Sequence, residues 1–126
     1  MTEEEKASLV KEFQEKEVKA AIFSMKSASP PGPNGFGVPF FKDLWSSLNK
    51  DYLALFHDLH KGVLDIRRLN YGVITLVPKV RKANNIKQYR PICLLNVDYK
   101  VITKVPNNSL SPLHKNCSLR PRMMYI

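Results

Sequence analysis

The sequence predicts an α+β fold made of two long helices, a small antiparallel β-hairpin and a short helix. Apolar residues recur at three- and four-residue spacing in two segments of the first 61 residues, as in amphipathic helices. Two short runs rich in β-branched and apolar residues follow, and the nine residues 80–88 form the loop between them. A chain of 126 residues is expected to form one domain with a modest core.

The first helix is expected over residues 3–26. Thr2 and Glu5 have the spacing of a capping box, and the early acidic residues suit the positive end of a helix. The prolines of the following loop, residues 27–35, remove backbone donors and fix φ, so neither a helix nor a central strand can continue. Asn34-Gly35 predicts a turn in this loop. A plain connector is the alternative interpretation.

The second helix is expected from Pro39 to Lys61, because proline suits a first helical turn and Gly62 suits the position after the last one. Its broad apolar stripe predicts a buried face. His57 and His60 lie three residues apart near its end, but no third metal ligand of matching spacing accompanies them. No metal site is therefore predicted.

Residues 71–77 predict a strand that is buried on both faces or nearly so, closed by Pro78. Residues 89–95 predict its partner strand. Asn96 can cap a short helix over residues 97–105, which Pro106 is expected to end. Residues 106–126 show no clear period and are expected to form a poorly ordered tail.

The positive charge lies in the second half of the chain. Residues 1–60 hold seven Lys and nine acidic residues, a net charge of −2, whereas residues 61–126 hold thirteen Lys or Arg and two acidic residues, a net charge of +11. This asymmetry favours a polyanionic partner, such as a nucleic acid or a nucleotide. A basic, solvated surface without a specific ligand is the alternative.

The predicted hairpin sets Lys79 and Arg90 at the two ends of its loop. Arginine grips phosphate oxygens with a planar fork and lysine supplies a mobile point charge, so the pair predicts a triphosphate site. Arg81, Lys82 and Lys87 lie in the loop and are predicted to add attraction or to touch a nucleic-acid backbone. A hairpin tip that is basic only for solubility remains the alternative.

Three segments, KSASPPGPNGFGVPFFKDLW, LNYGVITLVPKV and QYRPICLLNVDYKVITKV, occur in this order. With the helix before them they span residues 3–105, and they resemble the start of the reverse transcriptase domain of LINE-type, non-LTR retrotransposons, especially those of plants. The resemblance implies the fingers of a right-hand RNA-directed DNA polymerase over residues 1–105, with a divergent tail over 106–126. It also implies that Lys79 and Arg90 contact the nucleotide triphosphate.

By the same resemblance, the loop that contains Gly32, Pro33, Asn34 and Gly35 lies near the template strand. The family usually has Asp where Asn34 stands, and the final residues CSLRPRMMYI do not match it. The aspartates that hold Mg²⁺ in the intact family follow this region, in the palm, and are expected to be missing. The chain is therefore expected to bind template and nucleotide without a metal cofactor and without polymerase activity of its own.

Two alternatives stay open from the sequence: a non-enzymatic basic module that binds nucleic acid or protein, and a translated pseudogene product. Cys93 and Cys117 are too few for a disulfide framework, the N-terminal residues are acidic, and no apolar run approaches a membrane-spanning length. A nuclear or cytosolic location without a membrane anchor is expected.

Overall fold

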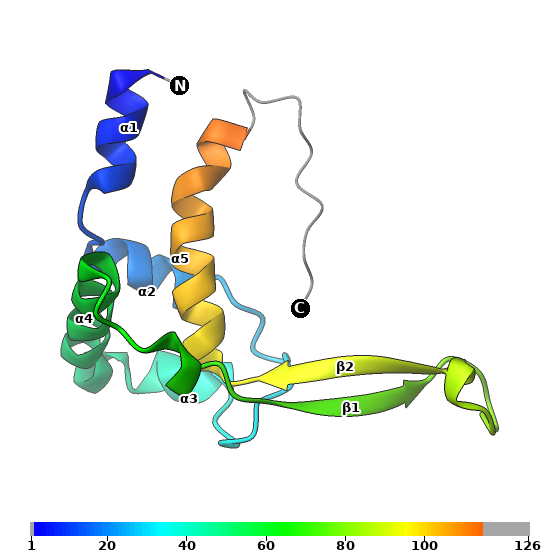
Figure 1. The fold of residues 1–126 in the computed structure, drawn as a ribbon. Helices are drawn as coiled ribbons and strands as arrows, with labels where there is room; N and C mark the ends of the chain where they lie inside the picture. Colours follow the sequence, from blue (N-terminus) through cyan, green and yellow to red (C-terminus); the bar gives the residue numbers. More distant parts are fainter. Residues whose placement is uncertain (1, 115–126) are drawn as a thin grey trace.

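The computed structural model describes residues 2–114 (Figure 1). In chain order these residues form α1 (Glu3–Val10), α2 (Glu15–Phe23), α3 (Val38–Asp43), α4 (Trp45–Lys61), β1 (Gly72–Pro78), β2 (Tyr89–Leu95) and α5 (Val97–His114), with 3₁₀ turns at Ile66–Arg68 and Ile86–Gln88. The predicted α+β class is confirmed. Cys117 and the rest of the predicted tail beyond residue 114 lie outside the described residues.

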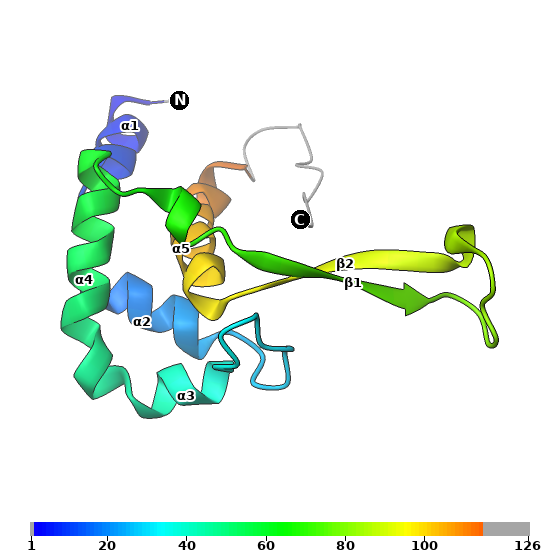
Figure 2. The ribbon, with the colours of Figure 1, turned by 60° about the horizontal axis from the view of Figure 1, so that its bottom comes forward.

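The core lies between α2, α4 and α5, with α3 closing one end. The hairpin of β1 and β2 projects sideways from this helical layer (Figures 1 and 2). The buried core side chains are Val18, Ala21, Ile22, Val38, Phe41, Trp45, Tyr52, Phe56, Val97, Val101, Ile102 and Val105. The apolar stripes of the sequence therefore meet one another, as their periods predict.

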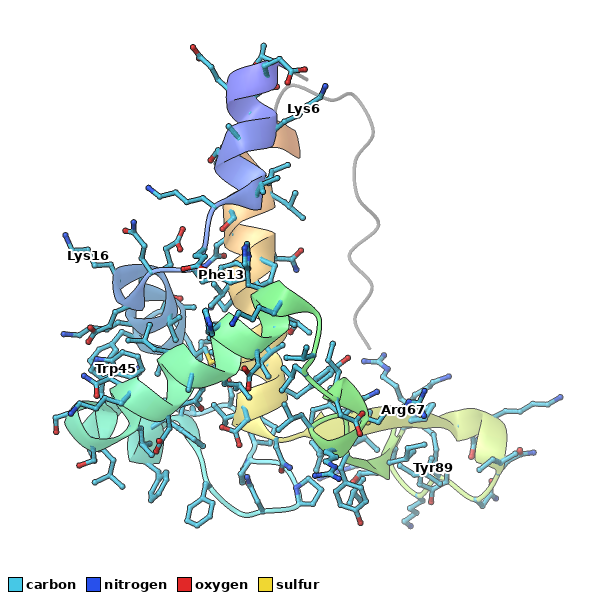
Figure 3. The ribbon with its side chains drawn as sticks, turned by 60° about the vertical axis from the view of Figure 1, so that its left-hand side comes forward. Lys6, Phe13, Lys16, Trp45, Arg67 and Tyr89 are labelled. Atoms are coloured by element: carbon cyan, nitrogen blue, oxygen red, sulfur yellow. The ribbon has the colours of Figure 1, made fainter. Side chains whose placement is uncertain are left out.

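The single helix predicted over residues 3–26 is wrong, because α1 and α2 are separated by four residues. Lys11 and Gln14 are extended, and the Glu17 carboxylate accepts a hydrogen bond of 2.8 Å from the Gln14 backbone N–H. The break turns Phe13 toward α4, where its ring meets Phe56 edge-on with centroids 5.3 Å apart (Figure 3). This aromatic contact offsets the lost helical turn.

The helix predicted from Pro39 to Lys61 is divided at Leu44, whose φ of −97° and ψ of 13° separate α3 from α4. The bend buries both Phe41 and Trp45. The predicted end is confirmed, since Gly62 follows α4 with a φ of +72° and its N–H donates to the carbonyl of Leu59. Glycine reaches this left-handed conformation without steric cost.

The bounds predicted for the second strand are confirmed, but the predicted burial of the first strand is wrong. Six of the seven residues of β1 are exposed, with Ile74 at 71%. The described residues supply no layer over either face of the two-stranded sheet, so its apolar composition does not lead to burial.

Helix α5 continues through Pro106 to His114, so the predicted end at Pro106 is also wrong. Proline removes one helical hydrogen bond, but tertiary packing can sustain a helix through it. Here α1 lies beside the segment after Pro106, where Thr2 and Ser8 border the same surface as Ser109. Among the described helices none is long and apolar enough to cross a membrane.

The loop between α2 and α3 crosses the junction of β2 and α5 at contact distance. A Cβ on Gly32 would lie 2.3 Å from the backbone N of Asn96 and 2.4 Å from the carbonyl carbon of Leu95. The Asn96 side-chain oxygen accepts a hydrogen bond of 3.1 Å from the backbone N–H of Asn34. Lys100 Nζ donates to the carbonyl of Pro30 at 3.2 Å. These contacts fix the loop at the base of the hairpin.

A second polar link joins α4 to the first turn of α5. The Tyr52 hydroxyl donates a hydrogen bond of 2.5 Å to Asp98 Oδ1. Burial, followed by this hydrogen bond and the charge of the carboxylate, raises the pKa of Tyr52 above its ordinary value of 10.0. Asp98 lies in the first turn of α5, where an acidic side chain stabilises the helix dipole, and it is also an acceptor for the core tyrosine.

Replacement of Gly32 by Ala is expected to destabilise the protein by roughly 1–3 kcal/mol, because the added methyl group overlaps the Leu95–Asn96 peptide. Gly37→Ala is the matched control, since its new Cβ would lie 3.5 Å from the nearest atom, Pro39 Cδ. Urea unfolding followed by circular dichroism measures both. Equal stability of the two variants would contradict the close crossing.

Tyr52→Phe is expected to cost about 1–2 kcal/mol near pH 7, because Asp98 loses its donor. The raised pKa of Tyr52 keeps it protonated in the folded state above pH 10.0, where the unfolded state ionises. The stability advantage of the parent protein over the Tyr52→Phe variant should therefore be constant from about pH 7 to pH 10.0 and fall above pH 10.0 by about 1.4 kcal/mol per pH unit. The other groups that titrate in this range are common to both proteins and cancel. A difference that does not change up to pH 11.5 would refute the link.

Candidate nucleic-acid and nucleotide interface

The hairpin tip is held in a defined shape by its own polar groups. The Lys79 backbone N–H donates to the carbonyl of Gln88 at 2.8 Å, which extends the ladder by one pair beyond Pro78 and Tyr89. The Gln88 side-chain oxygen accepts from the backbone N–H groups of Asn84 and Asn85 at 2.9 and 3.2 Å. The Tyr89 hydroxyl donates to the carbonyl of Ala83 at 3.0 Å. The loop is therefore an ordered platform for its cations.

The register of the hairpin predicts that Lys79, one residue past β1, shares a face with Arg90. Arg90 pairs with Val77, and Lys79 is two residues beyond Val77, so strand alternation gives both cations the same side. They occupy diagonal positions across the two strands. Such positions are separated by about 7–8 Å, a distance that long side chains can span. Both residues are exposed, and Lys79 Nζ donates to the carbonyl of Lys87 at 3.3 Å. The predicted pairing of these two residues is thus geometrically available.

Arg81, Lys82 and Lys87 surround this pair on the same tip, and all three are exposed. Lys82 has a φ of +56°, the left-handed conformation of a tight turn. The segment 71–96 contains five cationic residues and no acid. The ion pairs between lysine or arginine and acidic side chains among the described residues are Lys6–Glu3 and Arg68–Asp65, and neither involves the hairpin. The field of the tip is therefore not offset by a neighbouring carboxylate.

The residues predicted to contact a template, Gly32 to Gly35, form a turn at the opposite end of the hairpin. The Gly35 N–H donates to the carbonyl of Gly32 at 3.0 Å, and Gly35 has a φ of +78°. Asn34 Oδ1 accepts from the backbone N–H of Phe36 at 3.1 Å. Because β2 is seven residues long, this turn lies roughly 20 Å from the tip cations. The predicted binding residues thus form two groups, one at each end of the hairpin.

Sequence reasoning missed Lys100 as a member of the second group. Its ammonium reaches the Pro30 carbonyl across 70 residues of chain, and this contact sets a cation beside the Pro/Gly loop. A contact between residues this far apart in sequence leaves no local signal in the sequence.

The described residues contain no group of three or more His, Cys, Asp or Glu side chains that could hold a metal ion. His57 Nδ1 lies 3.7 Å from a carboxylate oxygen of Glu12, and the His60 ring meets Phe13 edge-on. These contacts give both histidines a role in holding the α1–α2 connection against α4.

No family model matches the chain. The chain is 33% identical over 89 residues to the transposon TX1 uncharacterized 149 kDa protein of Xenopus laevis. The match covers 70% of this chain but 7% of that protein, so the chain spans a small part of its relative's length. The matched protein is encoded by a transposon, and the resemblance found in the sequence is likewise to a family of mobile elements.

Proposed function

We propose that the chain is part of the fingers of a retrotransposon RNA-directed DNA polymerase and binds nucleotide triphosphate and nucleic acid without polymerase activity of its own. The position of Lys79 and Arg90 as exposed, diagonal neighbours on one hairpin face supports this function. Transposon similarity over 70% of the chain supports the same origin.

The chemistry of the tip suits a triphosphate. Its several negative charges need at least two converging cations, and Arg90 can hold two phosphate oxygens at once. The flexible side chain of Lys79 allows its ammonium group to adjust to the position of the phosphates. Arg81, Lys82 and Lys87 attract the backbone of a nucleic acid. At the other end, Gly35 has open space beside its backbone, which offers a close approach for a template strand.

Catalysis needs carboxylates that the second half of the chain does not offer. Two-metal phosphoryl transfer requires acidic side chains that hold Mg²⁺ against the attacking and leaving oxygens. Asp65 accepts from the Arg67 N–H at 3.2 Å and lies 3.7 Å from Arg68, and Asp98 accepts from Tyr52. These are the two acids of residues 61–126, and both have structural partners.

A basic module that binds a protein is the second candidate, because apolar side chains on both faces of the hairpin are open to solvent. Val73 is 45% exposed and Leu76 is 48% exposed. The two functions differ in their response to salt. A nucleic-acid binder shifts single-stranded RNA in a gel at low salt and releases it as salt rises, whereas a protein-binding module does neither.

Lys79→Ala and Arg90→Ala are each expected to lower the affinity for a deoxynucleoside triphosphate roughly tenfold, because each removes a charge-assisted hydrogen bond. Lys16→Ala is the control, since Lys16 is an exposed lysine on α2, on the far side of the molecule from Tyr89 and the hairpin (Figure 3). Isothermal titration calorimetry measures the three affinities.

If Lys79 or Arg90 contacts a nucleic-acid phosphate instead, its variant should reduce the salt slope of RNA binding by about one unit. Affinity for triphosphate and salt slope that both match the Lys16→Ala control would contradict the paired-cation site.

The chain is expected to give no primer extension with an RNA template and Mg²⁺, because the metal-binding aspartates of the resemblance have no counterpart in it. Incorporation of labelled nucleotide is measured against a no-protein control and against an active reverse transcriptase. Incorporation above the no-protein control that persists in a repurified sample would refute the assignment as an inactive fragment.

A further inference from the structure

A cleft of about 400 Å³ lies between α3, α4 and the first turn of α5, away from the hairpin tip. We name it the aromatic cleft. Phe36, Phe40, Tyr52 and Leu69 supply much of its apolar lining, and Asp51 and Asp98 supply carboxylates. This volume is in the range of sites that hold a small molecule or a few side chains.

The rings of the aromatic cleft form a connected series. Phe36 stacks on Phe40 with centroids 4.3 Å apart, and Phe40 meets Phe41 edge-on at 5.2 Å. Phe36 is 46% exposed, so the apolar surface continues from the cleft onto the outside of the molecule. A ligand that places one group in the cleft and a neighbouring apolar group on Phe36 would cover this ring and bury more apolar surface.

The charge of the aromatic cleft is opposite to that of the chain. Its lining includes Asp51 and Asp98 and no Lys, Arg or His, although the chain carries a net charge of +9. Asp98 Oδ1 accepts from Tyr52, whereas Asp98 Oδ2 and the Asp51 carboxylate have no hydrogen-bond partner among residues 2–114. Carboxylates with unused acceptor positions beside aromatic faces favour a cation.

We propose that the aromatic cleft binds an arginine or lysine side chain of a polypeptide partner, with an apolar residue of that partner on Phe36. The rings accept the methylene stem and the carboxylates accept the charged end. Phosphate is repelled by the two carboxylates, which disfavours a nucleic-acid ligand. A free amine lacks the adjoining apolar residue and leaves Phe36 uncovered, so a polypeptide satisfies the whole surface. This inference is independent of the phosphate site at the hairpin tip.

The test is an NMR titration of the isotopically labelled full chain with the peptide Ac-Ala-Leu-Arg-Leu-Ala-NH₂. Chemical-shift changes should centre on Asn34, Phe36 and Leu55, which line the cleft. The same peptide with citrulline in place of arginine keeps the shape and loses the charge. It should bind at least about fivefold more weakly, the ratio that corresponds to one partly exposed ion pair. Equal binding of the two peptides would overturn the proposal.

Asp51→Asn should weaken binding of the arginine peptide about fivefold, the same ratio for one partly exposed pair. Asp58→Asn is the matched control, because Asp58 is an exposed carboxylate of α4 outside the cleft lining, and it should leave the affinity unchanged. Phe36→Ala should weaken binding of the peptide that has leucine beside arginine more than it weakens binding of a peptide that has glycine in place of leucine. Equal affinities of the Asp51→Asn and Asp58→Asn proteins would refute the cation site.

Three further outcomes would overturn the choice of occupant. Phenethylamine that binds as tightly as the arginine peptide would identify a small-amine site. A single-stranded oligonucleotide that displaces the peptide from the same residues would identify a nucleic-acid site. The same shifts on raising protein concentration alone would identify a second copy of the chain.

Discussion

The close crossing of Gly32 over the Leu95–Asn96 peptide is the contact on which the arrangement of this molecule depends. It joins the Pro/Gly loop to the junction of β2 and α5, which is distant from that loop in sequence. Leu95 and Val97 are buried on either side of the junction, so the base of the hairpin is anchored in the helical core while its tip is not. Only a residue without a Cβ allows this approach, and the Asn34–Asn96 hydrogen bond then fixes the turn beside it.

This anchored base separates the charges of the protein into two regions. The hairpin holds five cations and no acid, and it extends beyond the helices so that none of the described carboxylates pairs with it. The helical part holds most of the acids, two of which face the aromatic cleft. Because exposed charges are screened over about 10 Å at 0.1 M salt, a hairpin roughly 20 Å long keeps the two fields largely independent. The net charge of +9 is therefore an average over the basic hairpin and the more acidic helical part, and it represents the local charge of neither.

The elements that local chemistry specifies could be predicted from the sequence. The bounds of β2, the left-handed Gly62 and the capping pair of Thr2 and Glu5 follow from turn, cap and alternation rules, and all three are observed. The errors arise where tertiary packing overrides those rules. A helical period does not reveal a break that turns Phe13 inward. Pro106 lies inside a helix whose preceding residues, Val101, Ile102 and Val105, are buried in the core. Apolar composition in β1 likewise does not reveal whether another layer covers the strand.

The candidate binding residues show the same division between local and distant information. Lys79 and Arg90 could be predicted as neighbours from the sequence, because the two strands of a hairpin bring residues that are separated along the chain close together. The cleft could not, since Phe36, Tyr52 and Asp98 come from three elements that only the folded core brings together. The two surfaces differ in charge, because the hairpin carries five cationic residues and no acid, whereas Asp51 and Asp98 line the cleft. The two proposals therefore assign ligands of opposite charge to different parts of the fold, a polyanion to the hairpin tip and a cationic polypeptide to the cleft near the base of the hairpin.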